Sequence, residues 1–285
     1  MLKLTNFAEN IIMMDIQNNV ATFNADELKA RFNPEGSPLR RQQLIMLDML
    51  KELDRICRKY DIPYFLFWGT LLGAIRHDGF IPWDDDLDVA MLRKDYLRLM
   101  KILPSELPED IALQSNDTDS NYFYFLAKLR HRKSFLEKEP FADGFAERGI
   151  FIDIFPLDNL LPWTHKLRLQ SLAYNFYRAG NGSDKALTKI RMLTWFNRHV
   201  SFPVLRAMSR LAGAKTLICD YGIPFHKEHR LENIFPLKTH VFEDMETFVP
   251  GNSDAVLKSL YGDYMKLPED LDNVYHHAEG IVITE

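Results

Sequence analysis

A short strand, a short helix and a second strand follow one another between residues 64 and 91, and this order constrains the fold more than any other feature. Tyr64–Phe67 is an apolar run of strand type, and Gly69–His77 has the character of a short helix. A turn then leads to a second strand, expected over Leu87–Met91, with a group of acidic residues at its start. This succession of elements predicts an α/β (α+β) protein.

Four aspartates crowd the start of the second strand. Asp84, Asp86 and Asp88 alternate, so on an extended strand they share one face, ~6.6 Å apart along the backbone, whereas Asp85 faces the other way. Carboxylates this close repel one another, and such clusters persist when cations neutralise them. An oxygen-only ligand set favours a hard ion, Mg²⁺, Mn²⁺ or Ca²⁺, over zinc. An EF-hand loop does not fit, because Val89 stands where that loop needs glycine.

The residues around this cluster point to phosphoryl chemistry. A helix that begins at Gly69 and Thr70 offers free N–H groups, a hydroxyl and close backbone approach to a phosphate. Asp86 and Asp88 on the next strand can bridge two metal ions, which stabilise the attacking and leaving oxygens of an in-line displacement. Asp153, a lone acid in the apolar run 149–155, is the expected third carboxylate, and it can also accept the proton of an acceptor hydroxyl.

Glycine with a small hydroxyl, then acid-apolar-acid, then a later lone acid resembles the nucleotidyltransferase fold of the DNA polymerase β type. Longer motifs are more specific: Leu-Arg-x-x-Gln at 39–43, Asp-Arg-Ile-Cys at 54–57, Gly-Thr-Leu-Leu-Gly-Ala-x-Arg at 69–76, Gly-Phe-Ile-Pro-Trp-Asp-Asp-Asp-x-Asp at 79–88 and Asp-Ile-Phe-Pro-Leu-Asp at 153–158. Together they resemble the LicD family, whose bacterial members are lipopolysaccharide and teichoic acid phosphocholine transferases and whose distant relatives are the fukutin-type ribitol-phosphate transferases. The resemblance covers residues 38–160 and returns at 261–268.

The resemblance implies a nucleotidyltransferase-like mixed sheet with flanking helices and an added helical segment. It also implies a CDP-alcohol donor, usually CDP-choline, a glycan or lipid-linked glycan acceptor, and dependence on Mg²⁺ or Mn²⁺, with two ions expected. The implied metal ligands are Asp84, Asp86, Asp88 and Asp153, and the last three are also the implied catalytic residues. The implied contacts to donor phosphate or substrate are Gly69, Thr70, Arg76, Lys128, Arg130, Tyr261, Asp263 and Tyr264, with Arg132 a further candidate.

The chain divides by pattern into an N-terminal arm (1–36), a catalytic core (37–160), a basic helical segment (161–216) and a C-terminal extension (217–285) that completes the same domain. Helices are expected from Pro38, capped by Ser37, to about residue 61, from Lys94 to Leu103 before Pro104, and over Ser253–Tyr261. Further strands are expected over Tyr122–Leu129 and over Gly149–Phe155, the latter ended by Pro156.

The net charge and the number of cysteines restrict the possible binding partners and the cellular compartment of the protein. The net charge of −5 gives no case for nucleic-acid binding, although residues 161–215 carry ten Lys and Arg against Asp184 alone. A solvated helical face and contact with an anionic membrane or a lipid-linked acceptor both fit that stretch. Cys57 and Cys219 are expected to be reduced, and no apolar run is long enough to span a membrane. We expect no secretory signal in residues 1–10. We expect a cytoplasmic protein, with attachment at the inner face of the membrane left open.

Other functions stay open at this stage. A glycosyltransferase that binds Mn²⁺ and a nucleotide-sugar through Asp-x-Asp would have no use for Asp153, and a catalytically inactive metal- or glycan-binding protein would have no use for the complete set of acids. Tyr122–Phe125 could form an aromatic cage for a quaternary ammonium group, but alternating aromatic residues are more typical of a core. Trp83 and His77 are expected to be structural.

Overall fold

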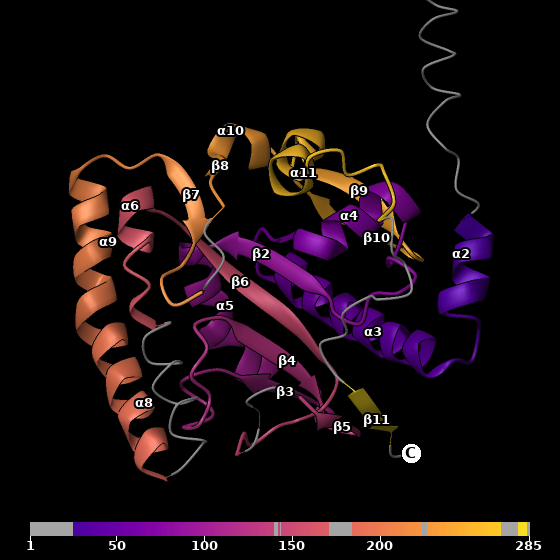
Figure 1. Ribbon diagram of the computed structural model, residues 1–285, viewed down its shortest axis with the longest axis horizontal. Helices are drawn as coiled ribbons and strands as arrows, with labels where there is room; N and C mark the ends of the chain where they lie inside the picture. Colours follow the sequence, from indigo (N-terminus) through magenta and orange to yellow (C-terminus); the bar gives the residue numbers. More distant parts are fainter. Residues whose placement is uncertain are drawn as a thin grey trace, which may run out of the picture.

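A mixed β-sheet runs through the centre of the computed structural model, which describes residues 25–139, 142, 144–170, 184–223, 227–268 and 279–283 (Figure 1). Within these residues the sheet has seven strands in the order β1–β2–β6–β4–β3, with β7 also beside β6 and β8 beside β7. Among its strand pairs, β2 and β6 run parallel and the others are antiparallel. The strands are β1 (Phe65–Leu66), β2 (Asp88–Leu92), β3 (Ile111–Gln114), β4 (Ala127–His131), β6 (Phe151–Asn159), β7 (Thr216–Cys219) and β8 (His229–Arg230).

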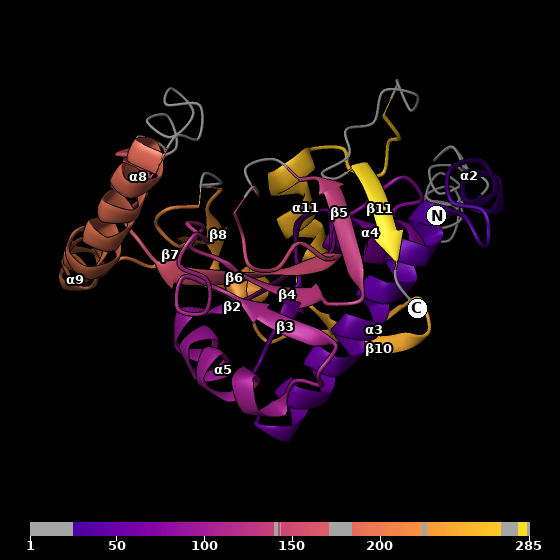
Figure 2. The same ribbon diagram turned by 90° about the horizontal axis from the view of Figure 1, so that it is seen from below.

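Helices pack around the sheet, and a helical arm lies at one edge of the molecule. The long helix α3 (Pro38–Lys59) and helix α5 (Arg93–Glu106) pack together below the sheet in Figure 2, while α4 (Trp68–His77) packs against α11 (Ser253–Tyr261). Helix α8 (Asp184–Phe196), the π-helical turn η1 (Asn197–Ser201) and α9 (Phe202–Leu211) form a long arm at the edge of the molecule. The remaining elements are α2 (Ala25–Phe32), α6 (Pro162–His165), α10 (Leu231–Ile234), and the two-stranded sheets β5 (Ser134–Lys138) with β11 (Glu279–Ile283) and β9 (Lys238–Phe242) with β10 (Met245–Val249). This arrangement confirms the predicted α/β (α+β) class, with flanking helices and an added helical segment.

The start of α3 confirms the capping prediction. Ser37 Oγ accepts a hydrogen bond from the backbone N–H of Arg40 at 3.2 Å, and Pro38 is the first helical residue. The apolar stripe, which includes Leu50, Leu53 and Ile56, is buried against the sheet and α5. A good local cap and a regular apolar stripe were enough to define this element.

Two prolines do not end their elements, so those two predictions are wrong. Helix α5 continues past Pro104 to residue 106, because the proline removes one donor while Leu107 N–H still bonds to the Leu103 carbonyl at 3.0 Å. Strand β6 continues past Pro156, which lies between the last residue that pairs with β4, Ile154, and the first that pairs with β7, Leu157. Pro156 also pairs with Met91 of β2, and its carbonyl accepts the N–H of Asp220 at 2.9 Å, so these contacts continue the strand despite the missing N–H.

The predicted strand over 122–129 is also misplaced, since β4 begins at Ala127. Tyr122 and Phe123 instead form a small second core with Phe145 and Ile190, in which the ring centroids of Tyr122 and Phe145 are 5.3 Å apart. These aromatic residues therefore pack as a core rather than as an open cage.

Both cysteines are free, as predicted, and both are buried. Burial raises the pKa of the Cys57 thiol to about 12, which makes it unreactive in the folded protein. No helix within the described ranges is long and apolar enough to span a bilayer.

Candidate active site

Asp88 and Asp153 lie side by side in the sheet. Asp88 is the first residue of β2 and pairs in register with Asp153 of the parallel strand β6. Paired residues on neighbouring strands point to the same face, so the two carboxylates are neighbours. Across the other edge of β6, Asp153 pairs with Lys128 of β4, and Lys128 Nζ lies 2.6 Å from Asp153 Oδ1. Three strands thus bring two carboxylates and one ammonium group into a single row.

The backbone of Asp88 is held by the segment that begins α4. Thr70 Oγ1 accepts the N–H of Asp88 at 2.8 Å, and the Asp88 carbonyl accepts the N–H of Phe67 at 2.9 Å. Burial raises the pKa of the Asp88 carboxyl well above its usual range, the three other predicted metal ligands raise it further, and the Lys128 ammonium lowers it. A cation at this position would therefore stabilise the ionised form of Asp88.

The residues ahead of β2 are irregular, so Asp84 and Asp86 do not share with Asp88 the strand face that their alternation suggested. Only Asp88 belongs to β2, whereas Asp84 and Asp86 are half-buried in the preceding loop and Asp85 is buried. Helix α3 replaces a neighbouring strand here. Gln42 Nε2 donates to the Asp85 carbonyl at 2.6 Å, and Gln43 Nε2 donates to the Asp84 carbonyl at 2.9 Å.

The first turn of α4 lies against Asp84. A Cβ atom at Gly69 would stand 2.9 Å from Asp84 Oδ2, so a larger residue would displace that carboxylate. The residue before the helix, Phe67, provides no side-chain cap, which leaves the first-turn N–H groups to other partners. Trp68 has φ 43°, a conformation that bulky residues rarely adopt outside constrained sites. The positive end of a helix and an acidic side chain meet here, which suits a phosphate accompanied by a cation.

Arg76, in the last turn of α4, connects this site to the C-terminal segment. Its Nη1 donates to the Tyr264 carbonyl at 2.9 Å and its Nε donates to His77 Nε2 at 3.0 Å. Burial lowers the pKa of Arg76, and the charges of Tyr261 and Asp84 oppose that effect. Burial also raises the pKa of the Tyr261 hydroxyl, as do the charges of Asp88, Asp84 and Asp86. Arg76 and Tyr261 therefore lie within electrostatic reach of the carboxylates.

The other two predicted C-terminal residues are placed differently. The Tyr264 hydroxyl donates to Asp254 Oδ1 at 3.0 Å, so this residue reaches the site region through its backbone carbonyl alone. Asp263 is exposed in the turn that follows α11. The predicted structural residues behave as expected: Trp83 is buried between the rings of Phe32 and His77.

Arg130 is buried, and its guanidinium makes four hydrogen bonds within the protein. Its guanidinium, which is 0% exposed, bonds to Glu139 at 2.6 and 2.9 Å, to Gln114 Oε1 at 2.8 Å and to the Gly149 carbonyl at 2.9 Å. Lys128, two residues earlier on β4, is therefore the basic residue that β4 places against Asp153.

Glu243 is a positioning residue that the sequence did not indicate. Its carboxylate accepts two hydrogen bonds from the Arg40 guanidinium, at 2.7 and 3.2 Å, and one from the Phe80 backbone N–H at 3.1 Å. A Cβ atom at Gly79 would stand 2.5 Å from Glu243 Oε1, so the glycine of the motif makes room for this contact. Arg40 and Glu243 are 203 residues apart, and no local sequence pattern indicates that they pair.

The four predicted metal ligands form the acidic group: Asp84, Asp86, Asp88 and Asp153. In the described part of the chain, no set of three or more His, Cys, Asp or Glu side chains is arranged to hold a metal ion, so these carboxylates would have to turn toward one another to share one. The donor chemistry nevertheless fits a hard divalent cation, since the group offers carboxylate oxygens alone and its charges repel. The metal site stays a prediction.

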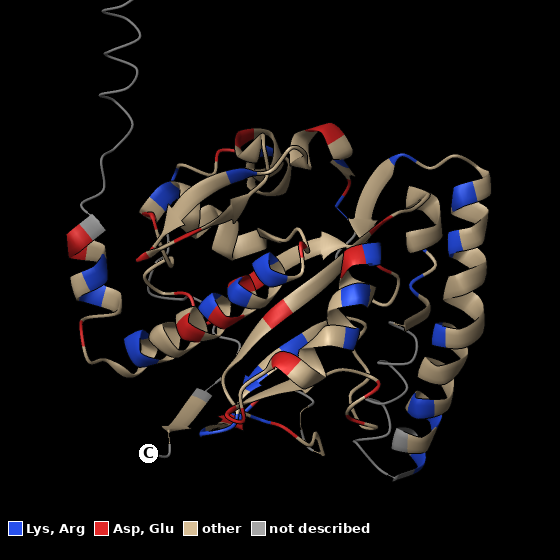
Figure 3. Ribbon diagram, turned by 180° about the vertical axis from the view of Figure 1, so that it is seen from behind, with Lys and Arg blue, Asp and Glu red and all other residues tan. Residues whose placement is uncertain are grey.

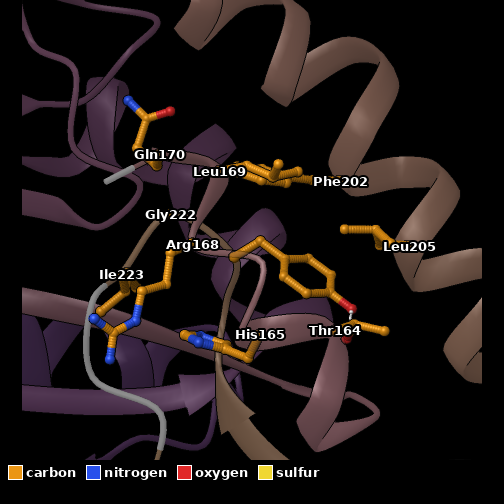
Figure 4. A pocket seen from close by; sticks show the side chains of 10 residues that line it. Thr164, His165, Arg168, Leu169, Gln170, Phe202, Leu205, Gly222 and Ile223 are labelled. Carbon is orange, nitrogen blue, oxygen red and sulfur yellow. Dashed lines mark hydrogen bonds between the residues drawn. The ribbon is translucent and has the colours of Figure 1, made fainter. Parts of the chain in front are cut away.

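A cavity between α6 and α9 is too small to hold a nucleotide. Its lining includes His165, Phe202 and the segment that follows β7 (Figure 4). Its volume of ≈ 20 Å³ admits a single water molecule. Two hydroxyls of the lining, those of Thr164 and Tyr221, bond to each other at 2.6 Å.

Comparison with known proteins places the acidic group within a recognised domain. Residues 61–204 match the family model described as LicD/FKTN/FKRP, nucleotidyltransferase domain, and this span contains α4, β2 and β6. The lipopolysaccharide cholinephosphotransferase LicD of Haemophilus influenzae is 31% identical over 268 residues, which cover 86% of this chain and 98% of that protein. Two uncharacterised proteins match shorter stretches: one from Rickettsia prowazekii is 41% identical over 80 residues (28% of this chain, 29% of that protein), and one from Rickettsia typhi is 39% identical over 64 residues (22% and 21%).

Proposed function

Since the chain belongs to the LicD family, we propose that it transfers phosphocholine, or a related phospho-alcohol, from CDP-choline or another CDP-alcohol to a hydroxyl of a cell-surface glycan precursor. The acceptor would be of the lipopolysaccharide, teichoic acid or capsule type. One observation carries the proposal: Asp88 and Asp153 are paired in register on parallel strands, beside the start of α4. In this arrangement Asp153 can take part in the proposed reaction, whereas an Asp-x-Asp glycosyltransferase would not require an acid at this position.

Asp153 is the proposed proton acceptor. Its side chain is 14% exposed and is held by Lys128, so it is fixed in place and still accessible to an acceptor. In the proposed step the acceptor hydroxyl gives its proton to Asp153, and its oxygen bonds to the phosphorus that carries the alcohol. The bond from that phosphorus to the bridging oxygen breaks, and CMP leaves.

The donor phosphates are proposed to bind at the first turn of α4. Gly69 permits close approach of the backbone. The Thr70 hydroxyl accepts the Asp88 N–H, so its own proton is available to a phosphate oxygen. Arg76 and Lys128 would supply positive charge, and Tyr261 would border the donor. Positioning and charge neutralisation are the main requirements of phosphoryl transfer.

The acidic group is proposed to hold Mg²⁺, or Mn²⁺, with two ions expected. When bound, such ions neutralise the phosphates and polarise the phosphorus. The residues fit because they offer oxygen donors whose mutual repulsion a cation would relieve. We also propose a cytoplasmic location, which two buried free thiols support.

The test is CMP release from CDP-choline with Mg²⁺ and a glycan acceptor, followed by a panel of CDP-alcohols. Asp153→Asn is expected to lower kcat about 10²- to 10⁴-fold, in the range of a lost general base. Asp86→Asn and Asp88→Asn should also abolish most turnover. Asp48→Asn is the matched control, because Asp48 is 80% exposed on α3.

Three results would contradict the proposal. Unchanged activity of Asp86→Asn or Asp153→Asn would remove the assigned roles. Turnover of a UDP- or GDP-sugar with no turnover of any CDP-alcohol would identify a glycosyltransferase. Metal binding without turnover of either donor class would identify an inactive binding protein.

A further inference from the structure

A continuous ridge of exposed apolar side chains runs along the helical arm formed by α8, η1 and α9. Its members follow one another at intervals of three or four residues, so they are neighbours on the helix surface. They are 39–90% exposed. The apolar ridge consists of Met192, Phe196, Val200, Val204, Met208 and Leu211, and Trp195, 60% exposed, lies beside it.

Other side chains of the arm anchor it to the rest of the described structure. Phe202 and Leu205 are buried in the main core, and Ile190 is buried in the smaller aromatic core. Gln170 bonds to Thr194 at 2.9 Å and accepts from Asn197 at 3.0 Å. Among the described residues, these contacts anchor one side of the arm, and the apolar ridge is exposed.

Basic residues border the ridge. Lys185 and Lys189 are exposed and extend the same spacing toward the start of α8, while Arg210 and Lys215 are exposed at the other end. Between residues 184 and 215 there are seven Lys and Arg against Asp184 alone, although the whole chain has a net charge of −5. Figure 3 shows the Lys and Arg bands along the arm. Positive charge is therefore concentrated on the element that exposes the apolar ridge.

We propose that this face of the arm binds the surface of a bilayer that contains anionic phospholipids, with the apolar ridge in the headgroup region. An exposed apolar stripe bordered by Lys and Arg is the pattern of helices that lie in a membrane interface. The basic residues add attraction to anionic headgroups. A second copy of the chain fits less well, since a symmetric contact through the ridge would bring two identical sets of positive charges together. The proposal does not depend on the transfer reaction.

The test is cosedimentation of the full chain with vesicles of phosphatidylcholine alone and of phosphatidylcholine mixed with phosphatidylglycerol. We expect binding to the mixed vesicles that weakens with added salt. Lys185→Glu/Lys189→Glu should weaken it by about tenfold or more. Met192→Ser/Phe196→Ser should weaken it comparably, through the apolar contribution.

Matched controls separate this face from net charge and from misfolding. Lys94→Glu/Lys101→Glu makes the same charge change at exposed positions of α5 and should leave most binding intact. Leu97→Ser removes an apolar side chain that is 46% exposed on α5 and should have no effect. Circular dichroism should show that every variant is folded. Brominated lipids should quench tryptophan emission in the wild type and quench it less in Trp195→Phe.

The proposal is overturned if the folded wild type fails to bind mixed vesicles, or if the α5 controls lose as much binding as the arm variants. A dimer in vesicle-free solution that Met192→Ser/Phe196→Ser dissociates, without vesicle binding, would identify a second copy as the partner of the ridge. CMP release with a water-soluble acceptor should be unchanged in the arm variants. A failure of membrane binding is therefore distinguishable from a failure of the proposed reaction.

Discussion

Replacement of Arg130 by methionine separates a structural role from the phosphate-binding role that the motif implies. The guanidinium is 0% exposed and makes four hydrogen bonds, two of them to a Glu139 carboxylate that is 8% exposed. Arg130→Met removes those donors and leaves the carboxylate buried without its partner. Breaking a buried ion pair from one side costs about 3–5 kcal/mol. At about 2–4 °C per kcal/mol, the melting temperature should fall by roughly 6–20 °C.

The assay is thermal unfolding followed by circular dichroism, with CDP-choline binding measured well below the transition. Arg130→Met/Glu139→Leu should recover part of the lost stability, because it removes the unpaired carboxylate. Arg230→Met is the control, since Arg230 is 80% exposed and its ion pair with Glu232 should contribute less than about 1 kcal/mol. If Arg130→Met melts like the wild type but loses donor binding, Arg130 contacts phosphate and the structural assignment is refuted.

Three further outcomes follow from single contacts. Thr70→Val leaves the buried Asp88 N–H without an acceptor and should lower the unfolding free energy by about 1–3 kcal/mol in urea titrations, while Thr70→Ser should stay close to wild type. Gly69→Ala places a methyl group 2.9 Å from Asp84 Oδ2 and should reduce kcat without a matching loss of thermal stability, whereas equal kcat would show that Asp84 moves freely. Burial lowers the pKa of His229 to about 4, so between that value and about 6.5 the unfolded chain binds more protons, and the free energy of unfolding falls as the pH is lowered. From pH 7 to 5 the wild type should lose about 2 kcal/mol more than His229→Gln, and parallel losses would contradict the assignment.

Elements with local signals could be predicted from the sequence. The cap of α3 and the span of α11 are encoded within a few residues by a capping side chain and an apolar stripe. The end of α4 at His77 follows from the turn-prone Asp78, which adopts the left-handed conformation. Pro104 and Pro156 do not end their elements, because neighbouring hydrogen bonds outweigh the one N–H that each proline lacks. At Pro156 those bonds come from strand pairing, which is a tertiary property.

The sequence indicated which acidic residues belong to the candidate site, but it indicated less about how they are arranged in space. The register that brings Asp88 beside Asp153 follows from strand pairing, which the two sequences favour but do not specify. Gln42 and Gln43 of α3 bind the backbone carbonyls of the loop ahead of β2, and nothing in the loop itself indicates this. The motif alone does not distinguish the two basic residues of β4. Lys128 forms an ion pair with Asp153, whereas Arg130 forms a buried ion pair with Glu139.

Two contacts near the candidate site join residues 76 and 80 to the C-terminal part of the chain, so the site cannot form fully until that part has been synthesised. Phe80 binds Glu243, which is 163 residues later in the chain, and Arg76 binds the carbonyl of Tyr264, which is 188 residues later. At ribosomal speeds of about 5–20 residues per second, these partners are synthesised roughly 10–40 s after Phe80 and Arg76. During that interval the emerging chain carries its aspartates without the C-terminal contacts, and donor binding before release from the ribosome should be weak.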